Sequence, residues 1–150
     1  RIIEPSPKLF IGGAEVPTRG KPNPKKILDK INKGVDFFQT QYVFDSKVLK
    51  EYMKVLEDEG ILEKTNFIIG IGPFASAKSA KWMNENLFGV DVPEQIIKRL
   101  EGAKDQKEES KKICIELIEA FRNVPGVKGV HLMGHKKEEV ISEIIKESKK

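Results

Sequence analysis

Four mostly apolar segments alternate with helical patterns, and this alternation constrains the fold more than any other feature of the chain. The segments cover residues 9–14, 35–45, 66–71 and 127–133. Amphipathic helical patterns separate them, and two further helices precede the last segment without a strand between. Near-continuous apolar strands are typical of a parallel sheet that is covered by helices. The sequence therefore predicts an α/β protein.

Capping residues mark where the helices begin and end. Asn23 followed by Pro24 is a favoured helix start, and Asp45 or Ser46 caps the next helix, which Gly60 ends. Further helices are predicted from Ser76 and from Pro93. Two more are predicted from their apolar stripes, which are Ile113, Leu117, Ile118 and Phe121, and Val140, Ile141, Ile144 and Ile145. The four strands and their helices form four βα units in one α/β domain over residues 1–150.

Two architectures accommodate four βα units. One is half of a (β/α)8 TIM-type barrel, whose full size is roughly 250 residues. The alternative is a small doubly wound parallel sheet. Both architectures place functional residues at the carboxyl ends of the strands, where Gln41, Gly72 and Met133 lie.

The second segment carries two glutamines in an otherwise apolar strand, which we expect to be buried on both faces. Strand alternation puts Gln39 and Gln41 on one face and leaves Phe38, Thr40 and Tyr42 on the other. A buried amide without a partner costs roughly 1–3 kcal/mol. The pair therefore suggests a polar site, unless neighbouring backbone or buried water satisfies each amide.

Composition argues against several classes of protein. No apolar run approaches the roughly 20 residues of a membrane span, and no signal-peptide pattern precedes the first strand. The 27 basic and 23 acidic residues are well mixed, and the basic clusters lack interleaved aromatic residues, so nucleic-acid binding is not expected. One Cys and two His give no metal site. We expect a cytoplasmic protein in which Cys114 is a small buried hydrophobe.

Two further features have structural interpretations. The run Gly70-Ile71-Gly72-Pro73-Phe74-Ala75 matches a dinucleotide-binding fingerprint on paper. However, Pro73 removes a backbone donor where a phosphate needs one, and the run follows the third strand rather than the first. We interpret it as a strand-end turn. His131, on the last strand, is interpreted as a hydrogen-bonded core histidine.

Several motifs and their order resemble one known family. In chain order they are Gly13-Ala14-Glu15-Val16-Pro17, Lys30, Gly34, Phe38-Gln39-Thr40-Gln41-Tyr42-Val43-Phe44-Asp45, Gly70-Ile71-Gly72-Pro73, Val92-Pro93 and Gly126-Val127-Lys128-Gly129-Val130-His131-Leu132-Met133. Together they resemble the C-terminal half of methylenetetrahydrofolate reductases, flavin enzymes built on an eight-stranded βα barrel.

The resemblance implies roles for individual residues. The implied cofactor-binding residues are Ala14 and Val16 along the flavin, Lys30 near its phosphates and Gln39 beside its ring. The implied substrate-binding residues are Gln41 on the folate pterin, then Ser79, Met83, Met133 and Lys137. Val16, Ser79 and Met133 depart from the family pattern, because well-known bacterial members carry an aromatic, a glutamine and a tyrosine there.

The resemblance also implies an activity. It is the flavin-dependent reduction of methylenetetrahydrofolate, or of a related methylene-pterin, to the methyl form. The cofactor is FAD or FMN, and the external reductant stays open among NAD(P)H, a deazaflavin, a ferredoxin or a partner subunit. The family's catalytic acid and flavin-gripping segment belong to the first four strands, so no catalytic residue is assigned in this chain.

The start of the chain suggests a fragment or a processed subunit. It begins at Arg1 without a Met, and residues 2–7 look like a connection from an earlier segment. We therefore expect the chain to be inactive alone and to associate with a missing N-terminal half or with a second copy of itself. The alternative is a non-catalytic subunit or interaction module that uses a half-barrel surface to bind a partner.

Overall fold

The computed structural model describes residues 7–134 and 136–149. Residues 1–6 of the predicted N-terminal connection lie outside the described residues. The described elements, in chain order, are β1 (Gly12–Glu15), the 3-10 helix η1 (Pro17–Arg19), α1 (Pro24–Asn32), β2 (Phe37–Tyr42), α2 (Ser46–Asp58), β3 (Asn66–Ile71), α3 (Ala77–Asn86), α4 (Glu94–Gly102), α5 (Gln106–Arg122), β4 (Val127–Leu132) and α6 (Glu138–Glu147).

The strands form one parallel sheet in the order β1-β2-β3-β4. Each strand therefore pairs with the next strand along the chain, and the order never reverses. A doubly wound sheet needs such a reversal at its switch point. The described strands thus exclude the doubly wound alternative, and the α/β fold is that of half a (β/α)8 barrel.

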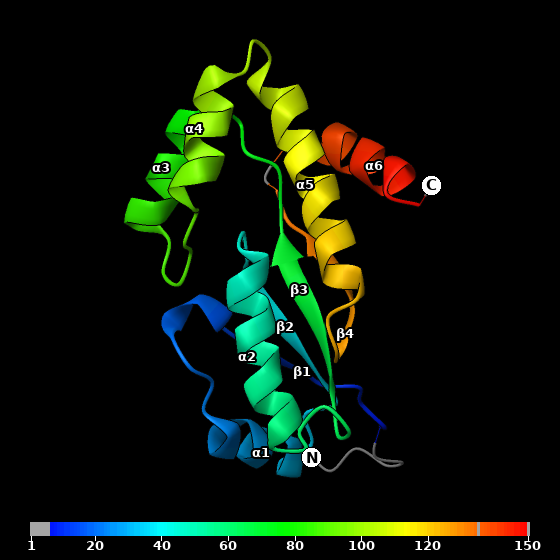
Figure 1. Ribbon diagram of the computed structural model, residues 1–150. Coiled ribbons are helices and arrows are strands. Elements are labelled where there is room, and N and C mark those ends of the chain that lie inside the picture. The colour runs from blue at the N-terminus through cyan, green and yellow to red at the C-terminus, as the bar shows by residue number, and fades with distance from the viewer. Residues whose placement is uncertain (1–6, 135, 150) are drawn as a thin grey trace.

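The helices cover one face of the sheet. In Figure 1, α2 and α5 lie in front of the strands, α1 lies below them, and α6 lies next to α5. Phe38, Phe67, Ile69 and Ile71 point into this layer and are fully buried. At 25–30 cal/mol per Å² of apolar surface, burial of such side chains is the main force that holds the helices on the sheet.

The opposite face has no covering layer in the described residues. Ala14, Gln39, Ile68 and Gly129 are register partners across the four strands, and none of them is buried. The prediction that the second strand is buried on both faces is therefore wrong for the described chain. The physical reason is that this face is the inner surface of an open half-barrel, which four strands cannot close.

The predicted start of α1 and both predicted ends of α2 are confirmed. The side chain of Asn23 accepts a hydrogen bond from the Lys26 amide at 3.1 Å, and Asp45 accepts one from Lys47 at 2.7 Å. Gly60 has φ +64° just after α2, a conformation that favours glycine.

The first strand is shorter and later than predicted. It covers Gly12–Glu15, whereas Leu9 and Phe10 are 71% and 78% exposed. Phe10 nevertheless stacks on Phe37 of β2, with ring centroids 5.2 Å apart. The apolar run predicts a strand from Leu9, but the pairing with β2 begins only at Gly12.

Candidate functional site

A β-bulge lies in the middle of the glutamine strand. Gln39 of β2 pairs with Ile68 of β3, but Tyr42 pairs with Gly70, so two residues of β2 lie opposite one residue of β3. Such bulges are rare in parallel pairs, and they are often found next to functional sites, where they redirect a side chain. The two residues are Thr40 and Gln41.

The predicted alternation of side chains holds up to the bulge. Phe38 and Thr40 are buried on the helix side, and Gln39 lies on the other face, as the alternation predicted, although it is exposed there rather than buried. Tyr42 was predicted to share the face of Phe38 and Thr40. Beyond the bulge it pairs with Gly70, and its ring lies where a side chain on Gly72 would point. It also stacks on the buried Phe44, with ring centroids 5.5 Å apart.

The Gln41 amide is held at both ends by backbone. Its Oε1 accepts a hydrogen bond from the Tyr42 amide at 3.0 Å, and its Nε2 donates to the Phe88 carbonyl at 3.1 Å. Phe88 belongs to the loop between α3 and α4, and Thr18 donates to the neighbouring Gly89 carbonyl. A primary amide has two donor hydrogens and two acceptor lone pairs. One of each is therefore still available to a ligand.

The uncovered sheet face beside Gln41 carries small and polar groups together with the partly buried Ile68. Ala14 and Gln39 are exposed neighbours on β1 and β2, and Gly129 has open space where a Cβ would point. His131 pairs with Gly70 and is only partly buried. The described residues include no hydrogen-bond partner for it, so the interpretation as a satisfied core histidine is wrong.

The glycines of the Gly70-Ile71-Gly72 run serve close packing. A Cβ on Gly70 would lie 2.5 Å from the Thr40 carbonyl oxygen and 2.6 Å from the Met133 methyl carbon. A Cβ on Gly72 would overlap the Met133 carbonyl oxygen and reach within 3.0 Å of the Tyr42 ring. These glycines let β3 pass between the bulge and the end of β4. A turn at the end of the strand therefore explains the run without a bound phosphate.

Lys30 is joined to the end of β1. Its Nζ donates to the Ala14 carbonyl at 2.7 Å and to Glu15 Oε1 at 2.6 Å, and Glu15 Oε2 accepts from the Tyr52 hydroxyl at 3.1 Å. Burial, followed by the charge of Glu15, raises the pKa of Tyr52. Lys30 lies 5.6 Å from the centroid of the Phe38 ring. The predicted phosphate contact of Lys30 stays a prediction, with one of its three donor hydrogens uncommitted.

Two predicted substrate residues lie on α3. Ser79 forms a capping box with Ser76: its Oγ donates to the Ser76 carbonyl at 2.8 Å and accepts from the Ala75 and Ser76 amides, both at 3.0 Å. This local role explains a serine at the third helical position. Met83 is partly buried and packs against the core. Their contacts with substrate stay predictions.

The other two predicted substrate residues follow β4. The amide of Met133 donates to the Ile71 carbonyl at 2.8 Å, and its methyl lies over Gly70. Lys137 donates to the Pro73 carbonyl, and burial lowers the pKa of its ammonium group. A cavity of about 640 Å³ opens here, with Lys107, Lys136 and Lys137 in its wall. It lies at the carboxyl ends of β3 and β4.

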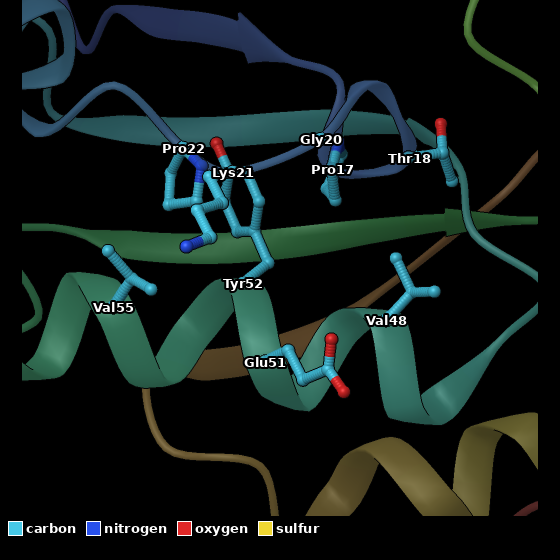
Figure 2. Close-up of a pocket in the computed structure, with 9 residues that line it drawn as sticks. All are labelled: Pro17, Thr18, Gly20, Lys21, Pro22, Val48, Glu51, Tyr52 and Val55. Carbon is cyan, nitrogen blue, oxygen red and sulfur yellow. The ribbon is translucent and has the colours of Figure 1, made fainter.

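A smaller cavity of about 300 Å³ lies beside α2. Figure 2 shows it between residues 17–22 of the loop after β1 and the side chains of Val48, Glu51, Tyr52 and Val55. It therefore belongs to the helix layer and contains none of the predicted site residues.

Other classes of site receive no support in the described part of the chain. No described helix has the length and apolarity needed to cross a membrane. Within residues 7–134 and 136–149, no group of three His, Cys, Asp or Glu side chains is placed to hold a metal ion. Cys114 is fully buried, and burial raises the pKa of its thiol to about 12, which makes it a poor nucleophile.

Sequence reasoning missed three components of the site. The Phe88 loop carries no motif, and only the tertiary fold brings it to Gln41. Lys107, in the first turn of α5, and Lys136, just before α6, line the same cavity as Lys137. The hydroxyl of Thr40 accepts from the Gly70 amide at 2.9 Å. For Thr40 a signal existed, because a buried threonine beside a glutamine in an apolar strand needs a polar partner.

Comparisons with known proteins agree with this geometry. A family model for methylenetetrahydrofolate reductase matches residues 21–149. A solved structure, described as an uncharacterized protein from Clostridium thermocellum that binds two copies of 5-methyl-5,6,7,8-tetrahydrofolic acid, is 26% identical with a TM-score of 0.59. The match covers 91% of this chain and 51% of that one, so this chain spans about half its length. No curated protein matches. The chain belongs to the methylenetetrahydrofolate reductase family.

Proposed function

We propose that this chain supplies the pterin-binding part of a flavin-dependent oxidoreductase of folate metabolism. The reaction is the reduction of methylenetetrahydrofolate, or of a related methylene-pterin, to the methyl form. The observation that carries the proposal is the Gln41 amide, which stands at the carboxyl end of β2 with one donor hydrogen and one lone pair uncommitted. Family membership and the methyltetrahydrofolate-binding neighbour support it.

The pterin edge and the Gln41 amide are chemically complementary. The pterin ring carries an amide-like edge that offers both a donor and an acceptor, and a carboxamide can meet both at once. The backbone bonds of Gln41 to Tyr42 and Phe88 fix its orientation before any ligand arrives. Such preorganisation reduces the entropy lost on binding.

The uncovered face fits a flavin. Ala14 and Gly129 leave room for a flat ring against the sheet, and Gln39 lies between their strands with an exposed amide. In this proposal Ala14, Val16 and Gln39 contact the flavin and Lys30 lies toward its phosphates. The bound flavin supplies the hydride chemistry, while the chain orients its ring and the pterin.

The cavity near Lys137 suits the acidic end of a folate. Folates carry glutamate carboxylates at the end opposite the pterin, and Lys107, Lys136 and Lys137 bring positive charge to the carboxyl ends of β3 and β4. Ser79, Met83 and Met133 lie on α3 and after β4, on the elements that flank this region. We propose that Lys137 receives the glutamate end.

Four further βα units complete the site in this proposal. The open edges of β1 and β4 invite association, and barrels remove such edges by closure. The neighbour's chain is about twice the length of the match, which leaves room for the remaining units in one polypeptide. A separate N-terminal half would serve the same purpose and would also supply the catalytic acid, whereas a second copy of this chain would only cover the open edges.

Calorimetric titration of the intact protein with 5-methyltetrahydrofolate tests the proposal. We expect one saturable class of site whose occupancy is competed by methylenetetrahydrofolate. A pterin lacking the glutamate tail should bind more weakly, because it lacks the carboxylates that Lys137 would meet. Absence of heat at ligand concentrations well above the protein concentration, with flavin bound, would contradict the pterin role.

A further inference from the structure

We infer that the Thr40 hydroxyl is a positioning group that aims the Gln41 amide at the pterin, an inference that rests on the proposed function of Gln41. Thr40 is 5% exposed on the helix-covered side of β2 and therefore touches no ligand on the uncovered face. Its influence on binding must act through its neighbour.

The Thr40 hydroxyl takes the place of a backbone carbonyl as the acceptor for an amide of β3. The Gly70 amide donates to Thr40 Oγ1 at 2.9 Å, and the same hydroxyl donates to the Gln41 carbonyl at 2.8 Å. Beyond the bulge, the Val43 amide donates to the Gly70 carbonyl at 2.8 Å. The hydroxyl thus connects the two strands at the one place where their backbones fall out of register.

This connection determines what the Gln41 side chain can reach. The Gly70 amide is hydrogen-bonded to Thr40 Oγ1 and the Tyr42 amide to Gln41 Oε1, which accepts from it at 3.0 Å. The carboxamide is thereby turned so that its nitrogen donates to the Phe88 carbonyl at 3.1 Å. A strand without the bulge would be one residue out of register here, and such a slip sends side chains to the opposite face.

Two substitutions of Thr40 separate the effect of losing its hydroxyl group from the effect of changing its side-chain volume. Thr40→Val keeps the shape but leaves the buried Gly70 amide without its acceptor, and Thr40→Ser keeps the hydroxyl. A matched control is Thr65→Val, because Thr65 is also buried, at 3%, and donates to the Asp36 carbonyl at 3.0 Å before β3 begins. The control loses a comparable hydrogen bond away from Gln41.

The experiment measures the position of the amide directly. The side-chain amide signals of Gln41 are followed by NMR in the intact protein and assigned by their loss in Gln41→Ala. In wild type, Thr40→Ser and Thr65→Val, we expect two resolved Gln41 amide proton signals that exchange slowly with solvent. In Thr40→Val, we expect the chemical shifts of these two signals to move to the values of a solvent-exposed amide. The dissociation constant of 5-methyltetrahydrofolate should rise about tenfold in Thr40→Val alone, because an amide that is no longer fixed in advance must be ordered when the ligand binds.

The outcomes distinguish this inference from the proposed function. Unchanged Gln41 signals and unchanged pterin affinity in folded Thr40→Val would overturn the inference and leave the function standing. If wild type binds no pterin, the proposed function fails, and the amide signals alone then decide whether Thr40 positions Gln41. Should Thr40→Val fail to fold, Thr40→Ser decides: loss of the Gln41 signals despite its hydroxyl would overturn the inference.

Discussion

Replacement of Gly72 by alanine is expected to lower the free energy of unfolding by about 3 kcal/mol or more, at the upper end for overpacking. The added methyl group would overlap the carbonyl oxygen of Met133 and press on the Tyr42 ring. A backbone carbonyl cannot rotate away as a flexible side chain can, so β3 and β4 would have to separate. Urea denaturation followed by circular dichroism measures the change.

Gly102→Ala is the matched control for this experiment. Gly102 ends α4, and nothing lies within 4 Å of the position that its Cβ would occupy. Alanine there should be neutral or stabilise by up to about 1 kcal/mol, because it restricts the unfolded chain. Equal stabilities of the Gly72→Ala and Gly102→Ala proteins would show that the β3–β4 packing described above is wrong.

Removal of the Gln41 amide is expected to weaken pterin binding by about 1–3 kcal/mol, the range for a lost buried hydrogen-bond partner. Gln41→Ala removes both the donor and the acceptor. Gln41→Glu keeps the shape but loses the donors and places a carboxylate against the Phe88 carbonyl. The loss of binding free energy in this variant should therefore lie at the upper end of that range. Calorimetry with 5-methyltetrahydrofolate measures both variants.

Flavin content separates a binding role from a structural one. Gln41 is assigned to the pterin, so bound flavin should stay unchanged in both variants. Gln95→Ala, on the exposed side of α4, serves as the control and should match wild type in both measurements. Parallel loss of flavin and pterin in Gln41→Ala would mean that the amide maintains the fold through Tyr42 and Phe88.

Local sequence signals determined most of the secondary structure. The strand over residues 66–71 agrees with β3 at both ends, and the capping residues Asn23, Asp45 and Ser76 lie where the helices begin. These signals act within a few residues, through hydrogen bonds that the sequence itself makes visible. These local signals do not distinguish a half-barrel from a doubly wound sheet; the observed strand order does.

The site was less accessible to sequence reasoning because it depends on tertiary contacts. Strict alternation did not predict the bulge, because the bulge forms between β2 and β3 and contains no glycine that would indicate it. The contact between Gln41 and Phe88 joins residues 47 positions apart. The inner face was expected to be buried because apolar strands usually are, whereas closure of a barrel requires strands beyond these four.

Oxidation of the reduced flavin by methylenetetrahydrofolate, measured in the absence of oxygen, tests the proposed reductase activity most directly. The intact flavin-loaded protein is reduced, mixed with methylenetetrahydrofolate in a stopped-flow instrument, and followed through the absorbance of oxidised flavin. The proposed function predicts that this absorbance returns in step with stoichiometric formation of methyltetrahydrofolate, and that Gln41→Ala slows the return at subsaturating substrate. Flavin that stays reduced in the presence of bound substrate would contradict the claim.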